Sequence, residues 1–249
     1  MNDLKQLDKE RLSEIINEFQ GKIFQSEAQF QFDLAWLLKE KYNCVVKLED
    51  MRMVVRRNEK VIQKFYTDIV VEQGDYSVAI ELKYKTAEYN GDDVDLLDHS
   101  AVDLGRYDYL WDVFRIELLV NKQKGNIPNI NDNNCQLKVK ECNKGFAVLL
   151  TNEKKYWKGD SLDNKNHKPI DYQFHIGEDA NTLYGKKLDW KKDDKGNYPS
   201  TVFPKNGKPT FRAQPIILNE AYSYKWNDYR KALPTEQKNG DFRFVIIEI

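Results

Sequence analysis

The chain has 249 residues, of which 41% are hydrophobic and 32% are charged, and its formal net charge at pH 7 is -1. This length and hydrophobic content predict one large domain, or a core that carries an insertion. No run approaches the apolar length of a membrane span and the N-terminus has no apolar signal block, so we expect a cytoplasmic protein with no membrane partner. The near-zero charge argues against a strongly basic coat for nucleic acid, but it leaves room for one basic face.

The chain begins with two helical patterns. Apolar residues at helical spacing predict an amphipathic helix over residues 4–19. Ser26 is a good N-cap for a second helix that ends near Tyr42. Residues 44–48 are typical of a strand, and residues 51–56 either extend it or pair with it. Two helices therefore precede the first predicted strand.

The next segment has the pattern of a β-hairpin. Residues 64–71 and 76–84 are rich in β-branched and aromatic side chains, and the polar residues 72–75 between them suit a short turn. In residues 76–84 the even positions are apolar, whereas the odd positions are small or charged. This alternation predicts a strand with one apolar face and one face that carries charge.

Polar stretches and regular elements alternate after the hairpin. We expect a mobile polar loop over residues 86–100, near the charged face of the hairpin, and a helix over about 101–121. An Asn-rich stretch, 125–143, predicts an irregular excursion, and residues 146–150 predict a return to a core strand.

The last third of the chain contains one long polar stretch. Residues from about 158 to 210 are rich in Lys, Asp, Asn and Gly, and they predict a loop-rich insertion and not a second domain. Residues 222–233 predict a short helix or a strand and turn, and residues 242–249 predict a final strand. Taken together, the elements predict an α/β fold with a mixed central sheet flanked by helices.

Three charged residues of the hairpin have an unusual setting. Glu81 and Lys83 project from the same strand face, beside the small residues Ser77 and Ala79. Asp68 lies in the other strand, in a β-branched, apolar stretch, where a buried carboxylate is costly unless a cation or hydrogen bonds compensate. An acid two residues before a lysine is common in so charged a chain, but this context favours a functional site.

The set of Asp68, Glu81 and Lys83 resembles the catalytic motif of the PD-(D/E)xK nuclease superfamily, which has the restriction-endonuclease-like fold. Thr67 stands where that motif usually has proline. The resemblance covers residues from about 10 to 155 and the final strand, and it implies a restriction-endonuclease-like core. It also implies that Glu27, on the helix before the sheet, faces the site as a catalytic residue.

The resemblance implies a metal-dependent endonuclease that cleaves DNA by attack of an activated water, with a role in restriction or phage defence by analogy alone. Asp68 and Glu81 offer hard oxygen ligands for Mg²⁺, or for Mn²⁺ in its place. The main-chain carbonyl of Leu82 is the third metal ligand that the resemblance implies. Lys83 would orient the attacking water, lower its pKa or stabilise charge on the phosphate. A second ion, bound with the help of Glu27, is left open.

The expected partner is nucleic acid. Arg106 and Arg115, on the predicted helix 101–121, are candidates for phosphate contacts. The family resemblance favours DNA, although nothing in the sequence separates DNA from RNA. A homodimer would supply the two active sites that cutting both strands usually needs.

Each candidate residue also has a structural interpretation. Glu81 and Lys83 would form an exposed ion ladder across strands, and Asp68 would cap a turn or pair with Lys83 without a metal. Glu27 would stabilise the start of its helix through the helix dipole.

Alternatives remain for the later helix and for the whole protein. Asp108, Asp112 and Arg115 share one helix face and would most simply form ion pairs along the helix. For the whole protein, the alternatives are a non-catalytic nucleic-acid-binding or regulatory protein on a nuclease-like fold, and a nuclease that cleaves RNA. The intact set of two acids and a lysine argues against the first of these.

Overall fold

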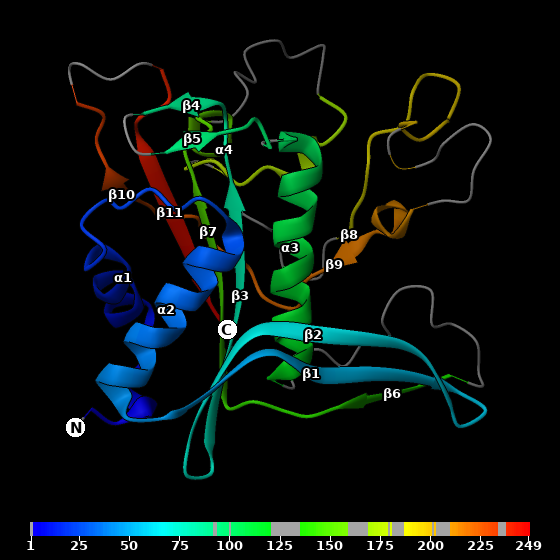
Figure 1. The fold of residues 1–249 in the computed structure, drawn as a ribbon. Coiled ribbons are helices and arrows are strands. Elements are labelled where there is room, and N and C mark those ends of the chain that lie inside the picture. The colour runs from blue at the N-terminus through cyan, green and yellow to red at the C-terminus, as the bar shows by residue number, and fades with distance from the viewer. Residues whose placement is uncertain are drawn as a thin grey trace.

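The centre of the molecule is a seven-stranded mixed sheet with helices on both faces (Figure 1). The fold is therefore α/β, as the alternation of helical and strand patterns predicts. Within the described residues, no helix is long and apolar enough to cross a membrane. The computed structural model describes residues 2–91, 94–99, 101–120, 135–158, 169–178, 180, 187–200, 202, 210–233 and 238–249.

The sheet has the strand order β10-β11-β7-β3-β2-β1-β6. Strand β3 pairs with β7 in parallel, and the other neighbouring pairs are antiparallel. Two parallel neighbours need a crossover connection, and helix α3 lies on it between β3 and β7. The strands are β1 (Val45–Arg57), β2 (Lys60–Gln73), β3 (Tyr76–Lys85), β6 (Cys135–Val139), β7 (Lys144–Thr151), β10 (Trp226–Arg230) and β11 (Phe242–Glu248).

Helices α1 and α2 lie on one face of the sheet and α3 lies on the other (Figure 1). Ser26 caps α2 as predicted, because its Oγ accepts a hydrogen bond from the backbone N–H of Gln29 at 3.1 Å. The single helix predicted over residues 4–19 is wrong, since Asp8 caps a new helix through the backbone N–H of Arg11 at 2.8 Å. The helical elements on the two faces of the sheet include η1 (Leu4–Gln6), α1 (Lys9–Asn17), α2 (Glu27–Tyr42), α3 (Val102–Leu119) and α4 (Lys155–Lys158).

The alternation of β3 divides the core into two layers. Ile80 and Leu82 pack in the layer of α1 and α2, whereas Ala79 packs in the layer of α3. The charged positions of β3, which share the parity of Ala79, therefore face α3. Beyond the pairing with β3, β1 and β2 continue as an arm that runs across the end of α3, and β6 pairs with β1 at the edge of this arm (Figure 1).

Several predicted elements change in the structure. Strand β1 is continuous, so residues 51–56 extend the first strand and do not pair with it. The predicted loop at 86–100 contains a short hairpin, β4 (Tyr89–Asn90) and β5 (Asp95–Leu96), whose Tyr89 and Leu96 are buried. In the Asn-rich stretch, residues up to 134 lie outside the described part, and β6 then adds a regular strand to the edge of the sheet.

The predicted insertion at about 158–210 is described only in part. Residues 159–168, 179, 181–186, 201 and 203–209 lie outside the described residues. Phe174, Leu188 and Trp190, from the described segments, are buried in the core layer of α3. Strand β8 (Lys187–Leu188) also pairs with β9 (Ile216–Ile217). These described segments therefore contribute side chains to the core layer of α3.

Candidate functional site

The candidate site lies where β2 separates from β3. The described ladder between these strands ends at the pair Ile69–Ile80, whereas β3 stays paired with β7 to its last residue. The backbone N–H groups of Leu82 and Tyr84 consequently point to an edge that β2 no longer covers. Buried N–H groups must find other acceptors, because an unpaired one costs about as much as a lost hydrogen bond.

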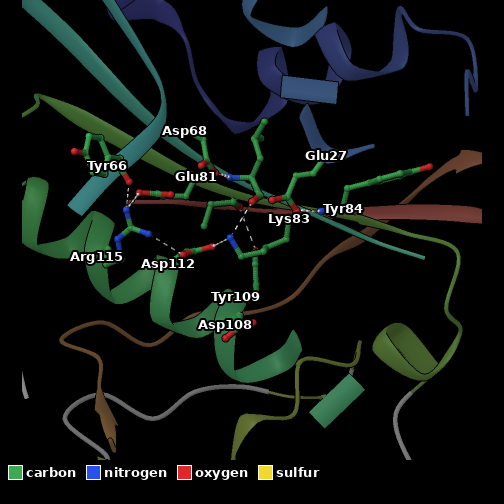
Figure 2. Close-up of polar contacts among 12 residues, drawn as sticks. Glu27, Tyr66, Asp68, Glu81, Lys83, Tyr84, Asp108, Tyr109, Asp112 and Arg115 are labelled. Atoms are coloured by element: carbon green, nitrogen blue, oxygen red, sulfur yellow. Dashed lines mark hydrogen bonds and ion pairs between the residues drawn. The ribbon is translucent and has the colours of Figure 1, made fainter. Parts of the chain in front are cut away.

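Two carboxylates provide those acceptors. Asp68, on β2, accepts a hydrogen bond from the backbone N–H of Leu82 at 2.6 Å. Glu27, the first residue of α2, accepts one from the backbone N–H of Tyr84 at 2.7 Å. Lys83 lies between these two positions, and its Nζ donates to the carbonyl of Leu82 at 3.1 Å. The opening of the ladder thus brings Asp68, Lys83 and Glu27 together (Figure 2).

Glu81 and Lys83 reach toward α3. Lys83 Nζ lies 2.6 Å from Asp112 Oδ2, and Glu81 Oε1 lies 2.8 Å from Arg115 Nη2. Arg115 Nη1 also lies 3.4 Å from Asp112 Oδ1, so one helix supplies partners to both strand residues (Figure 2). Glu81 is only 1% exposed and the Lys83 side chain 18% exposed, so the interpretation as an exposed ion ladder is wrong.

These side chains form a charged group that is largely shielded from water. Four carboxylates face two cations, so the group carries an excess of two negative charges when every member is ionised. Burial raises the pKa of Asp68 to about 6, against the attraction of Lys83. We call this group the acid cluster, and it consists of Glu27, Asp68, Glu81, Lys83, Asp112 and Arg115.

The two β3 residues of the acid cluster respond to burial in different ways. Burial raises the pKa of Glu81 well above its ordinary range, and the cation of Arg115 opposes the rise. Burial lowers the pKa of Lys83, but the attraction of Asp112 and the other acids outweighs it, and the net shift is upward. Lys83 is therefore protonated at every ordinary pH, which makes it a fixed cation and a poor general base.

The acid cluster has the chemistry to hold a hard divalent cation. Neither carboxylate oxygen of Glu81 accepts a hydrogen bond from a described residue, although the side chain is almost fully buried. Glu81 Oε1 already lies 2.8 Å from the Arg115 guanidinium, so Oε2 is the buried oxygen that a divalent cation would satisfy, and Mg²⁺ or Mn²⁺ would also offset the excess of negative charge. The described residues contain no ready-made group of three or more His, Cys, Asp or Glu for a metal. In this geometry, the cation beside Glu81 is the guanidinium of Arg115.

The two arginines predicted to contact phosphate have different surroundings. Arg106 is 1% exposed, its Nη1 lies 2.7 Å from Asp171 Oδ2, and its Nη2 donates to the carbonyl of Lys155 at 2.6 Å. A guanidinium buried in this way cannot meet a phosphate, so the structure does not support that role for Arg106. Arg115, whose side chain is 14% exposed, lies in the acid cluster instead.

Asp112 is the cluster residue whose role the sequence did not reveal. Its predicted ion pair with Arg115 is present at 3.4 Å, but its closer partner is Lys83 at 2.6 Å. Asp108, on the same helix, pairs with Arg212 at 2.6 Å instead. The signal that was available is the apolar sequence on both sides of Asp112, because an acid within such a stretch is buried and needs a cation.

Comparisons with known proteins give no family for this chain. No protein-family model matches it, and neither a curated protein nor a solved structure does. The function is therefore argued from the geometry and charge of the acid cluster itself.

Proposed function

We propose that this protein is a divalent-metal-dependent endonuclease that cleaves the phosphodiester bonds of DNA by attack of an activated water. The observation that carries the proposal is the pair of acids on β2 and β3, half-buried Asp68 and buried Glu81, with a protonated Lys83 beside them. Two costly charges of one sign in a sheet are hard to explain by stability alone, since acids without enough counter-charge destabilise the fold.

Four members of the acid cluster have a role in this proposal. Asp68, Glu81 and the carbonyl of Leu82 would hold Mg²⁺ or Mn²⁺. When bound, the ion would neutralise the phosphate and lower the pKa of a coordinated water. Lys83 would stabilise the negative charge that develops on the phosphate, because it is a fixed cation. Glu27 fixes the N-terminus of α2 against β3, because its Oε2 accepts the N–H of Tyr84, and its other carboxylate oxygen would be the one to reach a second ion.

The proposal of a restriction-endonuclease-like core rests on the order of the helices and strands along the chain. A helix, three strands that include a hairpin, a helix and a further strand are the order expected from the resemblance to the PD-(D/E)xK superfamily. This order supports a restriction-endonuclease-like core. DNA as substrate, a homodimer that cuts both strands, a cytoplasmic location and a role in restriction or phage defence are part of the proposal through the same resemblance.

One observation favours a second candidate, a non-catalytic nucleic-acid-binding or regulatory protein. In the structure, Lys83 pairs with Asp112 and Arg115 pairs with Glu81, so part of the acid cluster is already neutralised without a metal. A protein that needed no metal would keep this arrangement permanently. The excess of negative charge argues for the nuclease, and metal binding separates the two candidates.

A cleavage assay tests the proposal. Supercoiled plasmid, linear duplex DNA, single-stranded DNA and RNA would each be incubated with Mg²⁺, Mn²⁺ or EDTA. Asp68→Ala and Lys83→Ala should each lower the cleavage rate at least about a hundredfold, because general acid–base and electrostatic contributions are of that size. Asp241→Ala is the matched control, since Asp241 also accepts a backbone hydrogen bond, from Ala232 at 2.9 Å, but lies outside the acid cluster.

Each outcome of this assay decides something. Metal-dependent DNA cleavage that both cluster variants lose and Asp241→Ala keeps would support the proposal. Cleavage of RNA alone would move the substrate to the alternative nuclease. Folded wild-type protein that cuts no substrate, or variants that cut as well as wild type, would contradict the assignment of this site.

A further inference from the structure

Arg115 is the least expected member of the acid cluster. It extends from α3 to the gap between β2 and β3, and its side chain is 14% exposed. It makes three polar contacts there: with Glu81 at 2.8 Å, with Asp112 at 3.4 Å and with the backbone carbonyl of Tyr66 on β2. Its guanidinium also lies 6.0 Å from the ring centre of Phe65. The side chain is thus held at several points, of which the contact with Glu81 is only one.

The contact with Glu81 is the shorter of the two ion pairs of Arg115, at 2.8 Å against 3.4 Å for Asp112, but it lacks the geometry of a hydrogen bond. The atoms are close enough for an ion pair, yet neither oxygen of Glu81 accepts a hydrogen bond of good geometry from a described residue. Arg115 would keep Asp112 and the Tyr66 carbonyl if it left Glu81, so its own charge would not be stranded. The pair can therefore be broken from the side of Glu81, provided that another cation takes over that carboxylate.

We propose that Arg115 is a built-in counter-ion for Glu81, with which a divalent cation must compete for that carboxylate when it binds. This inference rests on the proposed function, since it assumes that Glu81 is a metal ligand. In the metal-free protein, Arg115 neutralises a carboxylate that is 1% exposed and would otherwise be buried without a partner. Arg115 thereby lowers the affinity of the site for metal, because the guanidinium and the metal would share one carboxylate and repel each other.

Lys83 does not have this role, although it is also a cation of the cluster. Its ion pair is with Asp112 and its other contact is with the Leu82 carbonyl. Asp112 is not among the proposed metal ligands, so Lys83 can keep that pair when a metal binds, although it would give up its contact with the Leu82 carbonyl, which is a proposed ligand. The two cations are therefore distinguishable by experiment: removal of Arg115 should strengthen metal binding, and removal of Lys83 should not free Glu81.

Calorimetric titration of the full chain with Mg²⁺ and with Mn²⁺ tests the inference, and it needs no substrate. Arg115→Gln should bind each metal about tenfold more tightly than wild type or better, because a unit charge within a few ångströms is removed. Arg243→Gln is the matched control, since Arg243 pairs with Glu178 at 2.7 Å and Asp228 at 3.1 Å, and neither acid belongs to the acid cluster. Its metal affinity should equal that of wild type.

A second substitution tests whether the effect acts through Glu81. In a Glu81→Gln background, the gain from Arg115→Gln should disappear, because no carboxylate remains for the arginine to occupy. If Arg115→Gln does not fold, Arg115→Met keeps the aliphatic stem beside Phe65 and serves as the neutral variant. The metal-induced rise in melting temperature should be larger for the neutral variant than for wild type.

The outcomes separate this inference from the proposed function. Equal metal affinity in wild type and Arg115→Gln would overturn the inference, whether or not the protein cleaves DNA. Tighter binding in Arg115→Gln that depends on Glu81 would support it, even if no substrate were ever cleaved. If neither protein binds a divalent metal, the inference and the metal-dependent mechanism both fall.

Discussion

Replacing Asp68 by Asn should stabilise the metal-free protein at neutral pH. Burial raises the pKa of Asp68 from 3.8 to about 6, so the folded state binds this proton more tightly than the unfolded chain does. The stability from this group is present in full below about pH 4 and is lost as the pH rises through about 6. A shift of about two pKa units corresponds to about 3 kcal/mol of destabilisation at neutral pH.

Asparagine removes the charge and keeps the shape. Its side-chain oxygen can still accept the hydrogen bond that the backbone N–H of Leu82 donates to Asp68 at 2.6 Å. The free energy of unfolding of Asp68→Asn at about pH 7.5 should therefore exceed that of wild type by up to about 3 kcal/mol. The difference should shrink toward zero as the pH falls below about 4, because Asp68 then becomes protonated in the unfolded state as well as in the folded state.

Urea unfolding with EDTA present, followed by tryptophan fluorescence across this pH range, measures the effect. Asp241→Asn is the control, since interaction with backbone N–H groups lowers the pKa of Asp241 and the same substitution should slightly destabilise the protein at neutral pH. Addition of Mg²⁺ should stabilise wild type more than Asp68→Asn. The reasoning is refuted if Asp68→Asn is less stable than wild type at neutral pH, or if the difference between them does not change with pH.

Two further predictions concern how α3 and α2 are held against the sheet. Gly145→Ala should lower the free energy of unfolding by about 1–3 kcal/mol, because a Cβ there would clash with the Ile116 side chain. Urea unfolding measures this change, and an unchanged free energy of unfolding would contradict the prediction. Ser26→Ala should lower the free energy of unfolding by about 1 kcal/mol, because the backbone N–H of Gln29 loses the acceptor that caps α2. Hydrogen exchange should then show fraying at Glu27, and Ser26→Asp should restore the protection. Equal exchange in all three proteins would argue against the cap.

Much of the candidate site was predictable because it depends on local patterns. Alternation in residues 76–84 placed Glu81 and Lys83 on one face, and both indeed reach α3. The cap at Ser26 placed Glu27 at the first turn of a helix. The apolar setting of Asp68 indicated a buried acid, and that burial accounts for its raised pKa. Each of these inferences needs only neighbours within a few residues.

The partners of these residues were not predictable in the same way. Arg106 and Arg115 are nine positions apart on one predicted helix and look alike in the sequence. Packing buries the first against Asp171 and directs the second to Glu81. Likewise, the segments around Trp190 have the composition of loops, but they pack against α3. The composition of a segment shows that its residues tolerate exposure to water. It does not show whether other parts of the chain will cover those residues in the folded protein.

The sequence by itself determined the class of fold, the hairpin and the three charged residues at its centre, because strand periodicity and turn chemistry are local properties. Only the tertiary structure decided that β2 separates from β3 after Ile69 and that α3 closes over the opening with Asp112 and Arg115. Those contacts join residues about 30 positions apart in the chain, and their geometry depends on the crossover that places α3 between the parallel strands β3 and β7. The charge balance of the acid cluster is therefore a property of the packed sheet and helix, not of any one segment.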